Sequence, residues 1–334
     1  MGKVKKRRDT TKRLSLILNV LLILALLASA FWVFSYKKSK DGEIDRLNKI
    51  IRATNENNII IPINDFKEYV TRYGVLTRFA QRYFPDKLVY PGYHGIVFAD
   101  IYQGIAENPL NKEECMVYEE GRAYYVDGDY QSQTGIDVSY SQGYIDWQKV
   151  VEDDIDFAII RVGVRGYATG RLFVDEFFHY NIKEANAVKM PVGVYFFSGA
   201  INEKEAIEEA DFVLKQIKGY NVELPIAFDM EDMNEPDSRM KELTTVEKTA
   251  IARAFCQRIQ EAGYDTLVYG NAKWLLESLN YQEIAEYGVW YANWDFLHWP
   301  YELMMYQYSS SGKVNGIKGR VDMDIGFFNY YKEQ

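Results

Sequence analysis

Eight short apolar runs alternate with helical stretches after residue 132, and this alternation constrains the fold more than any other feature of the chain. The runs begin at Gly135, Phe157, Met190, Leu224, Asp265, Gly288, Leu303 and Arg320. Stretches between them such as "TTVEKTAIARAFCQRIQEAG" are predicted helices, and this one ends in Gly263, a common helix stop. Eight strands that alternate with helices predict an α/β protein with a closed β/α barrel. The connections after Tyr281 are too short for full helices, so we expect an irregular barrel.

Acidic residues stand at the ends of three of these runs, where a β/α barrel carries its functional groups. The first run carries Asp137, the fourth carries Asp229 and Glu231, and the last carries Asp322 and Asp324. In a closed barrel the first and last strands are neighbours, and the fourth lies across from them. The sequence therefore predicts that acids from distant positions meet at one mouth of the barrel.

The stretch "FDMED" places Asp229 and Glu231 two residues apart in the fourth run. Residues i and i+2 of a strand point to the same face, about 6.6 Å apart along it. Two carboxylates at this range repel each other, so we expect the pKa of one to rise. A protonated carboxyl beside a charged one is the arrangement that cleavage of a glycosidic bond requires.

Two other roles for acids in this region are helix capping and calcium binding. Capping is the alternative role for Asp232 and Asp237, which follow the strand. Calcium binding is disfavoured, because "DMEDMNEPD" lacks the EF-hand spacing and its central glycine.

Composition and motifs argue against other functional classes. The formal net charge of -9 disfavours nucleic-acid binding. The 3 histidines are scattered and the 2 cysteines, Cys115 and Cys256, form no zinc or redox motif, while their pairing stays open. No Walker A or GxGxxG sequence occurs, "GVRGYATG" has the wrong glycine spacing, and "YSSSG" is no nucleophile elbow. We therefore expect neither a metal nor a cofactor.

Residues 14–36, "LSLILNVLLILALLASAFWVFSY", carry no charge and follow a basic segment, residues 1–13. About 23 residues at 1.5 Å each span about 34 Å, enough for a hydrocarbon core of about 30 Å. The positive-inside rule then predicts a single-pass cell-membrane protein with a cytoplasmic tail and an extracellular remainder. The alternative is a signal peptide cleaved at "ASA", with Phe31 as the mature N-terminus. The apolar run continues past that point, which favours the transmembrane helix.

Residues 37–131 are predicted to form an extracellular stalk or small α+β module. Ile44, Leu47, Ile50 and Ile51 lie at helical spacing, and Asp65 is a candidate N-cap of a second helix. "CMVYEEGRAYYVDGDY" reads as a hairpin with turns at Glu120-Gly121 and Asp127-Gly128. No catalytic motif occurs in this region, and residues 132–334 are left for the barrel.

The motifs "GIDVSYSQGYIDWQKV", "DFAIIRVGVRG", "MPVGVYFFS", "LPIAFDMED", "VWYANW" and "GRVDMDIGFF" occur in this order. Together they resemble the family 25 glycoside hydrolases, the muramidase type of lysozyme. The resemblance covers about Gln133 to Tyr330, roughly 60% of the chain. It implies an irregular, TIM-like (β/α) barrel. The implied activity is hydrolysis of the β-1,4 bond between N-acetylmuramic acid and N-acetylglucosamine in peptidoglycan.

The same resemblance implies roles for individual residues. Glu231 matches the general acid, and Asp229 matches a second carboxylate that stabilises the oxocarbenium-like centre or orients the substrate acetamido group. The residues expected to complete the site or to bind sugar are Asp137, Asp322, Tyr195, Tyr291, Tyr308 and Arg161. Asp322 is preferred to Asp324 because "VD" is the part that matches. The loop that begins at Arg161 departs from the family pattern, since it lacks the expected glutamate.

These features support a membrane-anchored muramidase that faces the cell wall, with glycan strands as its partner. One alternative is a catalytically silent wall-binding or scaffolding protein of a surface or secretion assembly, with other cell-surface proteins as partners. Another is a glycosidase that acts on a different polymer. Whether the reaction retains or inverts the anomeric centre stays open, because sequence spacing gives only backbone separation.

Overall fold

The computed structural model describes residues 35–38, 40, 42, 44, 76–232 and 235–332. The chain divides into two compact units, Met1–Glu68 and Tyr69–Gln334. In the first unit the described residues are helical. The predicted transmembrane helix lies outside the described residues except for its last two positions, Ser35 and Tyr36. Within the described ranges, no helix combines the length and the apolar character that a membrane crossing requires.

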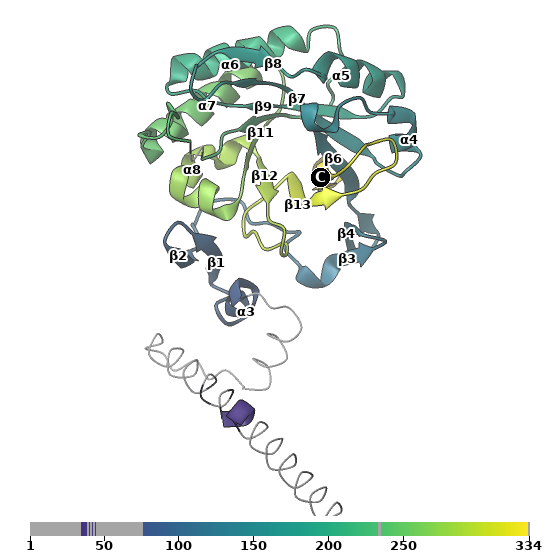
Figure 1. Ribbon diagram of the computed structural model, residues 1–334. Helices are drawn as coiled ribbons and strands as arrows, with labels where there is room; N and C mark the ends of the chain where they lie inside the picture. Colours follow the sequence, from purple (N-terminus) through teal and green to yellow (C-terminus); the bar gives the residue numbers. More distant parts are fainter. Residues whose placement is uncertain are drawn as a thin grey trace, which may run out of the picture. The chain divides into compact units, whose positions relative to one another are not determined.

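A closed barrel of eight strands forms the centre of the second unit (Figure 1). Its strands are β6 (Gln133–Val138), β7 (Phe157–Arg165), β9 (Val192–Phe197), β10 (Ile226–Asp229), β11 (Thr266–Gly270), β12 (Val289–Ala292), β13 (Met305–Gly312) and β14 (Val321–Gly326). Pairing of β6 with both β14 and β7 closes the ring. The predicted closed barrel is confirmed, and each predicted run corresponds to one strand. A short strand, β8 (Leu172–Val174), adds to β7 in antiparallel orientation.

The last strand runs in the opposite direction to the others. β6 to β13 pair in parallel around the ring, whereas β14 is antiparallel to both β13 and β6. A hairpin connection therefore replaces the helix that would otherwise join β13 to β14, since antiparallel neighbours need no crossover. This connection is one reason why the barrel is irregular.

Helices cover the outside of the barrel in its first two thirds (Figure 1). They are α4 (Trp147–Val151), α5 (Phe178–Ala187), α6 (Glu203–Gln216) and α7 (Thr245–Glu261). A capping box between Thr244 and Glu247 starts α7, and Gly263 at φ 89° follows its end. After β11 the helices are short: a π-helix (Trp274–Ser278), α8 (Tyr281–Ile284), a 3₁₀ turn (Ala285–Tyr287) and the terminal α9 (Phe328–Lys332). The expected irregularity after Tyr281 is confirmed.

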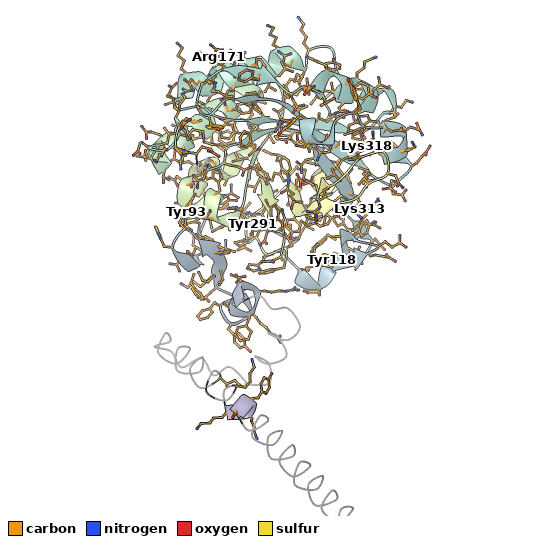
Figure 2. All side chains as sticks on the ribbon, in the orientation of Figure 1. Tyr93, Tyr118, Arg171, Tyr291, Lys313 and Lys318 are labelled. Carbon is orange, nitrogen blue, oxygen red and sulfur yellow. The ribbon has the colours of Figure 1, made fainter. Side chains whose placement is uncertain are left out.

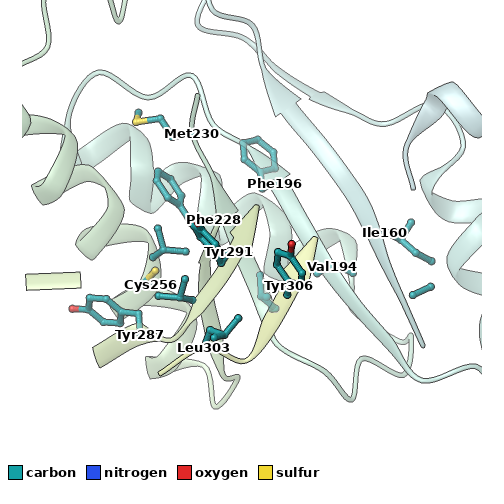
Figure 3. Packing of buried hydrophobic residues seen from close by; sticks show 14 of the residues in the cluster. Ile160, Val194, Phe196, Phe228, Met230, Cys256, Tyr287, Tyr291, Leu303 and Tyr306 are labelled. Atoms are coloured by element: carbon teal, nitrogen blue, oxygen red, sulfur yellow. The ribbon is translucent and has the colours of Figure 1, made fainter. Parts of the chain in front are cut away.

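The core has two layers, which come from opposite faces of the same strands. Ile159, Ala227, Leu267, Trp290 and Met305 fill the barrel interior. Their neighbours in sequence point outward and pack under the helices, and Figure 3 shows Ile160, Phe228, Tyr291 and Tyr306 among them. Because side chains of a strand alternate between faces, each strand supplies both layers. Strands buried on both faces appear in sequence as continuous apolar runs.

The segment before the barrel consists of small elements that pack against it. These are α3 (Leu76–Tyr83), the hairpin β1 (Lys87–Gly92) and β2 (Gly95–Asp100), and the sheet β3 (Met116–Glu119), β4 (Arg122–Asp127) and β5 (Tyr130–Gln131). The predicted turn at Glu120-Gly121 joins β3 to β4. Asn108 donates to the Trp299 carbonyl at 2.9 Å, and the Tyr125 ring lies 5.8 Å from that of Phe327. Both cysteines are free thiols, and Cys256 is buried.

Candidate active site

The barrel mouth is lined by polar side chains that stand one layer above the apolar interior. On β7 the inward position after Ile159 is Arg161, and on β10 the inward position after Ala227 is Asp229. The strands therefore carry small or apolar residues low in the barrel and ionisable residues at its rim. On the strands, the alternation of side chains between faces aims these groups at one point.

A cavity of about 320 Å³ opens at this rim. Its lining residues are Asp137, Arg161, Tyr195, Phe197, Asp229, Glu231, Tyr269, Trp290, Trp294, Gln307, Ser310 and Asp322. The structure thus brings together the four acids predicted from the sequence, along with Tyr195 and Arg161. Five of these six residues lie on β6, β7, β9, β10 and β14, and Glu231 lies two residues after the end of β10.

Asp322 reaches the cavity by a different geometry from that predicted. The sequence prediction placed the end of the last strand at the mouth, but β14 is antiparallel, so its first residues lie there. Asp322 stands opposite Asp137 in the β14–β6 pair. Asp324 lies deeper, is fully buried, and accepts a hydrogen bond from Trp290 Nε1 at 2.9 Å. Of these two aspartates, Asp322 is the one that lines the cavity.

Burial and mutual repulsion raise the pKa values of Asp229, the last residue of β10, and of Glu231, which follows it. For Asp229, which is 5% exposed, burial is the largest cause, followed by the charges of Glu231 and Asp137, while Arg161 lowers the pKa. For Glu231, burial again comes first, followed by the charges of Asp322 and Asp232. Four carboxyls this close cannot all be ionised, so the site retains protons that a free carboxyl would lose.

The pair from the first and last strands follows the same rule. Burial, followed by the charge of Asp322, raises the pKa of Asp137 to about 8, although a hydrogen bond from Gln307 lowers it. Burial raises the pKa of Asp322 to about 6. The cavity therefore holds protonated and charged carboxyls together near neutral pH, which suits proton donation to a leaving oxygen.

Gln307 and Tyr269 orient Asp137 through a chain of hydrogen bonds. Gln307 Nε2 donates to Asp137 Oδ2 at 2.8 Å, and the Tyr269 hydroxyl donates to Gln307 Oε1 at 3.0 Å. Trp294 Nε1 also donates to Gln307 Oε1, at 3.3 Å. With its amide used in this way, Gln307 fixes the direction of the Asp137 carboxyl at the cavity wall.

The model of the glycosyl hydrolases family 25 matches residues 136–317, which include most of these groups. The chain belongs to this family. It is 28% identical over 204 residues to Lysozyme M1 of Streptomyces globisporus, across 56% of this chain and 65% of that protein. It is 25% identical over 197 residues to the autolytic lysozyme of Clostridium acetobutylicum, across 57% of this chain and 54% of that protein. The predicted family is confirmed, and the chain spans less than two thirds of either relative.

A solved structure with a similar fold is the modular autolysin LytC from Streptococcus pneumoniae, in complex with a synthetic peptidoglycan ligand. It is 25% identical with a TM-score of 0.54, over 72% of this chain and 57% of that one. The similarity therefore extends beyond the segment that the family model matches, into residues that precede β6 or follow residue 317.

Arg161 of this family 25 domain lines the cavity, and its guanidinium forms an ion pair with Asp175. Its Nε donates to Asp175 Oδ2 at 2.8 Å, and its NH2 nitrogen lies 2.7 Å from the same oxygen. Its guanidinium also lies 4.8 Å from the centroid of the Tyr140 ring. Arg161 is the cation among the described residues that line the cavity. Its pairing with Asp175 leaves the carboxyls there weakly neutralised.

Tyr291 and Tyr308 lie away from the cavity, so the structure does not bring them together with the other predicted sugar-binding residues. Tyr291 is 1% exposed, and its ring stacks on that of Trp299 with 4.5 Å between centroids. Tyr308 belongs to the outer core layer. The neighbours Trp290 and Gln307 take the inward positions instead, because adjacent residues of a strand face opposite sides.

The described residues offer no metal centre at the barrel mouth or elsewhere, because no three His, Cys, Asp or Glu side chains are placed to hold an ion. The residues that the sequence prediction missed at the cavity are Tyr269, Trp290, Trp294, Gln307, Phe197 and Ser310. Aromatic rings beside carboxyls suit a ligand that has both apolar faces and hydroxyl groups, as sugar rings do.

Proposed function

We propose that this protein is a muramidase that hydrolyses the β-1,4 bond between N-acetylmuramic acid and N-acetylglucosamine in peptidoglycan. The observation that carries the proposal is the convergence of Asp137, Asp229, Glu231 and Asp322 in one open cavity. Membership of family 25 supports it, as do two relatives named as lysozymes and a similar autolysin solved with a peptidoglycan ligand.

Glu231 is the general acid in this proposal. Burial and the charges of Asp322 and Asp232 raise the pKa of Glu231 and so favour its protonated form, which gives its proton to the glycosidic oxygen as the carbon–oxygen bond breaks. The sugar carbon then carries positive charge. Asp229, which lines the same cavity, stabilises this charge directly or orients the substrate acetamido group toward it. Water adds to the carbon, and its proton returns to the Glu231 carboxylate.

Cellular location follows from the N-terminal sequence. The basic residues 1–13 and the uncharged residues 14–36 anchor the enzyme as a single-pass protein of the cell membrane. The barrel then faces the wall, where peptidoglycan lies. Retention of the full-length chain in membranes after an alkaline wash would support this part of the proposal, and its release would contradict it.

The first test compares Glu231→Gln with Asp237→Asn, an exposed acid six residues further along the same loop. We expect Glu231→Gln to lower the release of reducing ends from purified peptidoglycan by about 10²–10⁴-fold, because a carboxamide has no acidic proton to transfer to the leaving oxygen. Asp237→Asn serves as the control and should keep wild-type activity.

Full activity in Glu231→Gln would refute the proposed mechanism. A wild-type chain that binds peptidoglycan without cleaving it would instead favour the scaffolding alternative. Turnover of chitin with none of peptidoglycan would indicate a glycosidase for another polymer.

A further inference from the structure

The tip of the β1–β2 hairpin contacts the segment that carries the proposed general acid. Tyr93 lies in the two-residue turn between Gly92 and Gly95, and Figure 2 shows it at the edge of the barrel. Its hydroxyl donates to Asp232 Oδ2. Asp232 directly follows Glu231, so residues about 140 positions apart in sequence meet one residue from the acid.

The hairpin tip is held firmly where it meets the barrel. The Tyr93 hydroxyl lies 2.7 Å from Ser278 Oγ, and the Tyr93 amide donates to Glu277 Oε2 at 3.4 Å. Both partners belong to the π-helix that follows β11, a rare element that often occurs at functional sites. A Cβ atom on Gly92 would lie 2.3 Å from Glu277 Oε1 and 2.5 Å from a Val97 methyl group, so a larger residue there would displace the Glu277 side chain that contacts Tyr93.

Asp232 is held on its other side by a helix of the barrel. Lys248 of α7 lies 3.5 Å from Asp232 Oδ1, and its ammonium is 4.8 Å from the Trp274 ring centroid. Each carboxylate oxygen of Asp232 therefore has its own partner, one from the hairpin and one from α7. These contacts differ from helix capping, the alternative role that the sequence offered for Asp232.

The charges around Asp232 and Glu231 come from several elements. Lys248 and Tyr93 face Asp232, while Lys273 lies 4.3 Å from the Tyr93 ring centroid and Glu277 interacts with the Tyr93 hydroxyl. The groups that face Glu231 are Asp322 from β14, Asp137 from β6, Tyr269 from β11, and Asp229 and Asp232 from its own segment. Burial and Asp232 raise the pKa of Tyr93 to about 12, so its hydroxyl remains a donor in the working pH range.

We propose that the β1–β2 hairpin is a positioning element of the active site, in which Tyr93 holds Asp232 and thereby fixes the backbone that presents Glu231. The proposal rests on the role of Glu231 in the proposed function. In the described part of the chain, Asp232 makes the side-chain contacts that tie this segment to the hairpin and to α7. The segment before the barrel then acts on the reaction in addition to any role as a stalk.

The kinetic test uses Tyr93→Phe in the full-length chain, solubilised in a mild detergent. This change removes the hydroxyl and keeps the ring that packs beside Lys273. We expect kcat on soluble peptidoglycan strands to fall about three- to tenfold with KM unchanged, because misplacing a catalytic group slows chemistry more than binding. Tyr102→Phe, in the same segment but stacked on Tyr301, is the matched control and should behave as wild type.

The pH profile separates positioning from general destabilisation. The Asp232 carboxylate raises the pKa of Glu231, so a less firmly held Asp232 should lower it. The alkaline limb of kcat/KM should therefore move to lower pH in Tyr93→Phe, and further in Asp232→Asn. If Tyr93 acts through Asp232, the double variant should equal Asp232→Asn alone. Multiplicative losses in the double variant, or a wild-type kcat and pH profile in Tyr93→Phe, would overturn the proposal.

A titration that needs no turnover keeps this inference separate from the proposed function. The ¹³C carboxyl resonance of Glu231 can be assigned by its loss in Glu231→Gln and followed with pH. Its midpoint should be lower in Tyr93→Phe than in wild type and unchanged in Tyr102→Phe. An unchanged midpoint in Tyr93→Phe overturns the positioning role. A lowered midpoint in a chain without muramidase activity would uphold that role and reject the proposed function.

Discussion

Two groups of ionisable side chains, one at the barrel mouth and one between β7 and α6, differ in how completely their charges are compensated. At the mouth, Asp137, Asp229 and Glu231 line a cavity whose cation, Arg161, is already paired with Asp175. On the outer side of β7, Glu209 of α6 is fully buried beside Arg165, away from the cavity. Burial raises carboxyl pKa values in both groups, but the carboxylate of the second group has a cation and several hydrogen-bond donors as direct partners.

The second group has a partner for nearly every polar atom. Glu209 accepts from Arg165 Nε at 2.8 Å, from the Ser198 hydroxyl at 2.7 Å and from the Gly199 amide at 3.3 Å. Arg165 also donates to the Gly170 carbonyl at 2.8 Å. Burial raises the pKa of Glu209 to about 7, while each of these donors lowers it. A buried carboxylate with a cation and several hydrogen-bond donors thus indicates a structural ion pair. Carboxylates that lack such partners around an open cavity indicate an active site.

The largest expected effect on stability comes from breaking the structural pair. Arg165→Met keeps the apolar stem but leaves Glu209 buried without its cation. We expect the free energy of unfolding to fall by about 3–5 kcal/mol, measured by urea denaturation. The folded fraction should keep wild-type kcat, because Arg165 does not line the cavity.

Arg171→Met is the matched control for this change, since Arg171 is exposed and points away from the barrel in Figure 2. Its effect should stay within about 0.5 kcal/mol. Equal stabilities for the two variants would show that the contrast between the two groups has no energetic basis.

A smaller effect, and one that depends on pH, is expected at the mouth. The folded-state pKa of Asp137 is raised, so the folded protein holds this proton more tightly than the unfolded chain. Its contribution to stability is therefore full below the unfolded pKa and is lost as pH rises toward about 8. Asp137→Asn removes this loss, so the stability of the variant relative to wild type should rise by about 2–4 kcal/mol between pH 5 and 8.

Thermal or urea unfolding at several pH values measures this difference. Asp237→Asn, the same substitution at an exposed position, should give a pH curve parallel to that of wild type. If the pH curve of Asp137→Asn is also parallel to that of wild type, the pKa of Asp137 is not raised in the folded protein.

The smallest effects are expected from removing tyrosine hydroxyls, and they should differ between a tyrosine that faces the cavity and one that faces the outer core layer. Tyr195→Phe removes a hydroxyl at the cavity wall, and KM for peptidoglycan strands should rise about threefold or more. Tyr291→Phe removes the acceptor of a 3.2 Å hydrogen bond from Asn293 in the outer core layer. It should cost about 1 kcal/mol of stability or less and leave KM unchanged. A KM effect in Tyr291→Phe would contradict the assignment of the two layers.

Much of the fold and the candidate site could be predicted from the sequence, for identifiable reasons. Strands buried on both faces appear as continuous apolar runs, so all eight barrel strands could be located. Acids that interrupt such runs are costly to bury, which singled out Asp137, Asp229, Glu231 and Asp322. The aromatic residues were predicted less well, because Tyr side chains suit the core and the cavity equally. Only strand parity separates Tyr195 from Tyr291.

The sequence by itself determined which residues form the strands, their order along the chain and the family to which the barrel belongs. Tertiary structure alone decided three further points. First, β14 pairs antiparallel and so brings Asp322 to the mouth. Second, an irregularity in β7 between Arg161 and Gly163 lets Arg161 face the cavity while Arg165 faces α6. Third, the β1–β2 hairpin places the Tyr93 hydroxyl against the Asp232 carboxylate. The physical reason is the distance along the chain over which each interaction acts. Apolar periodicity is local, whereas pairing direction, bulges and contacts between distant segments depend on how the whole chain packs.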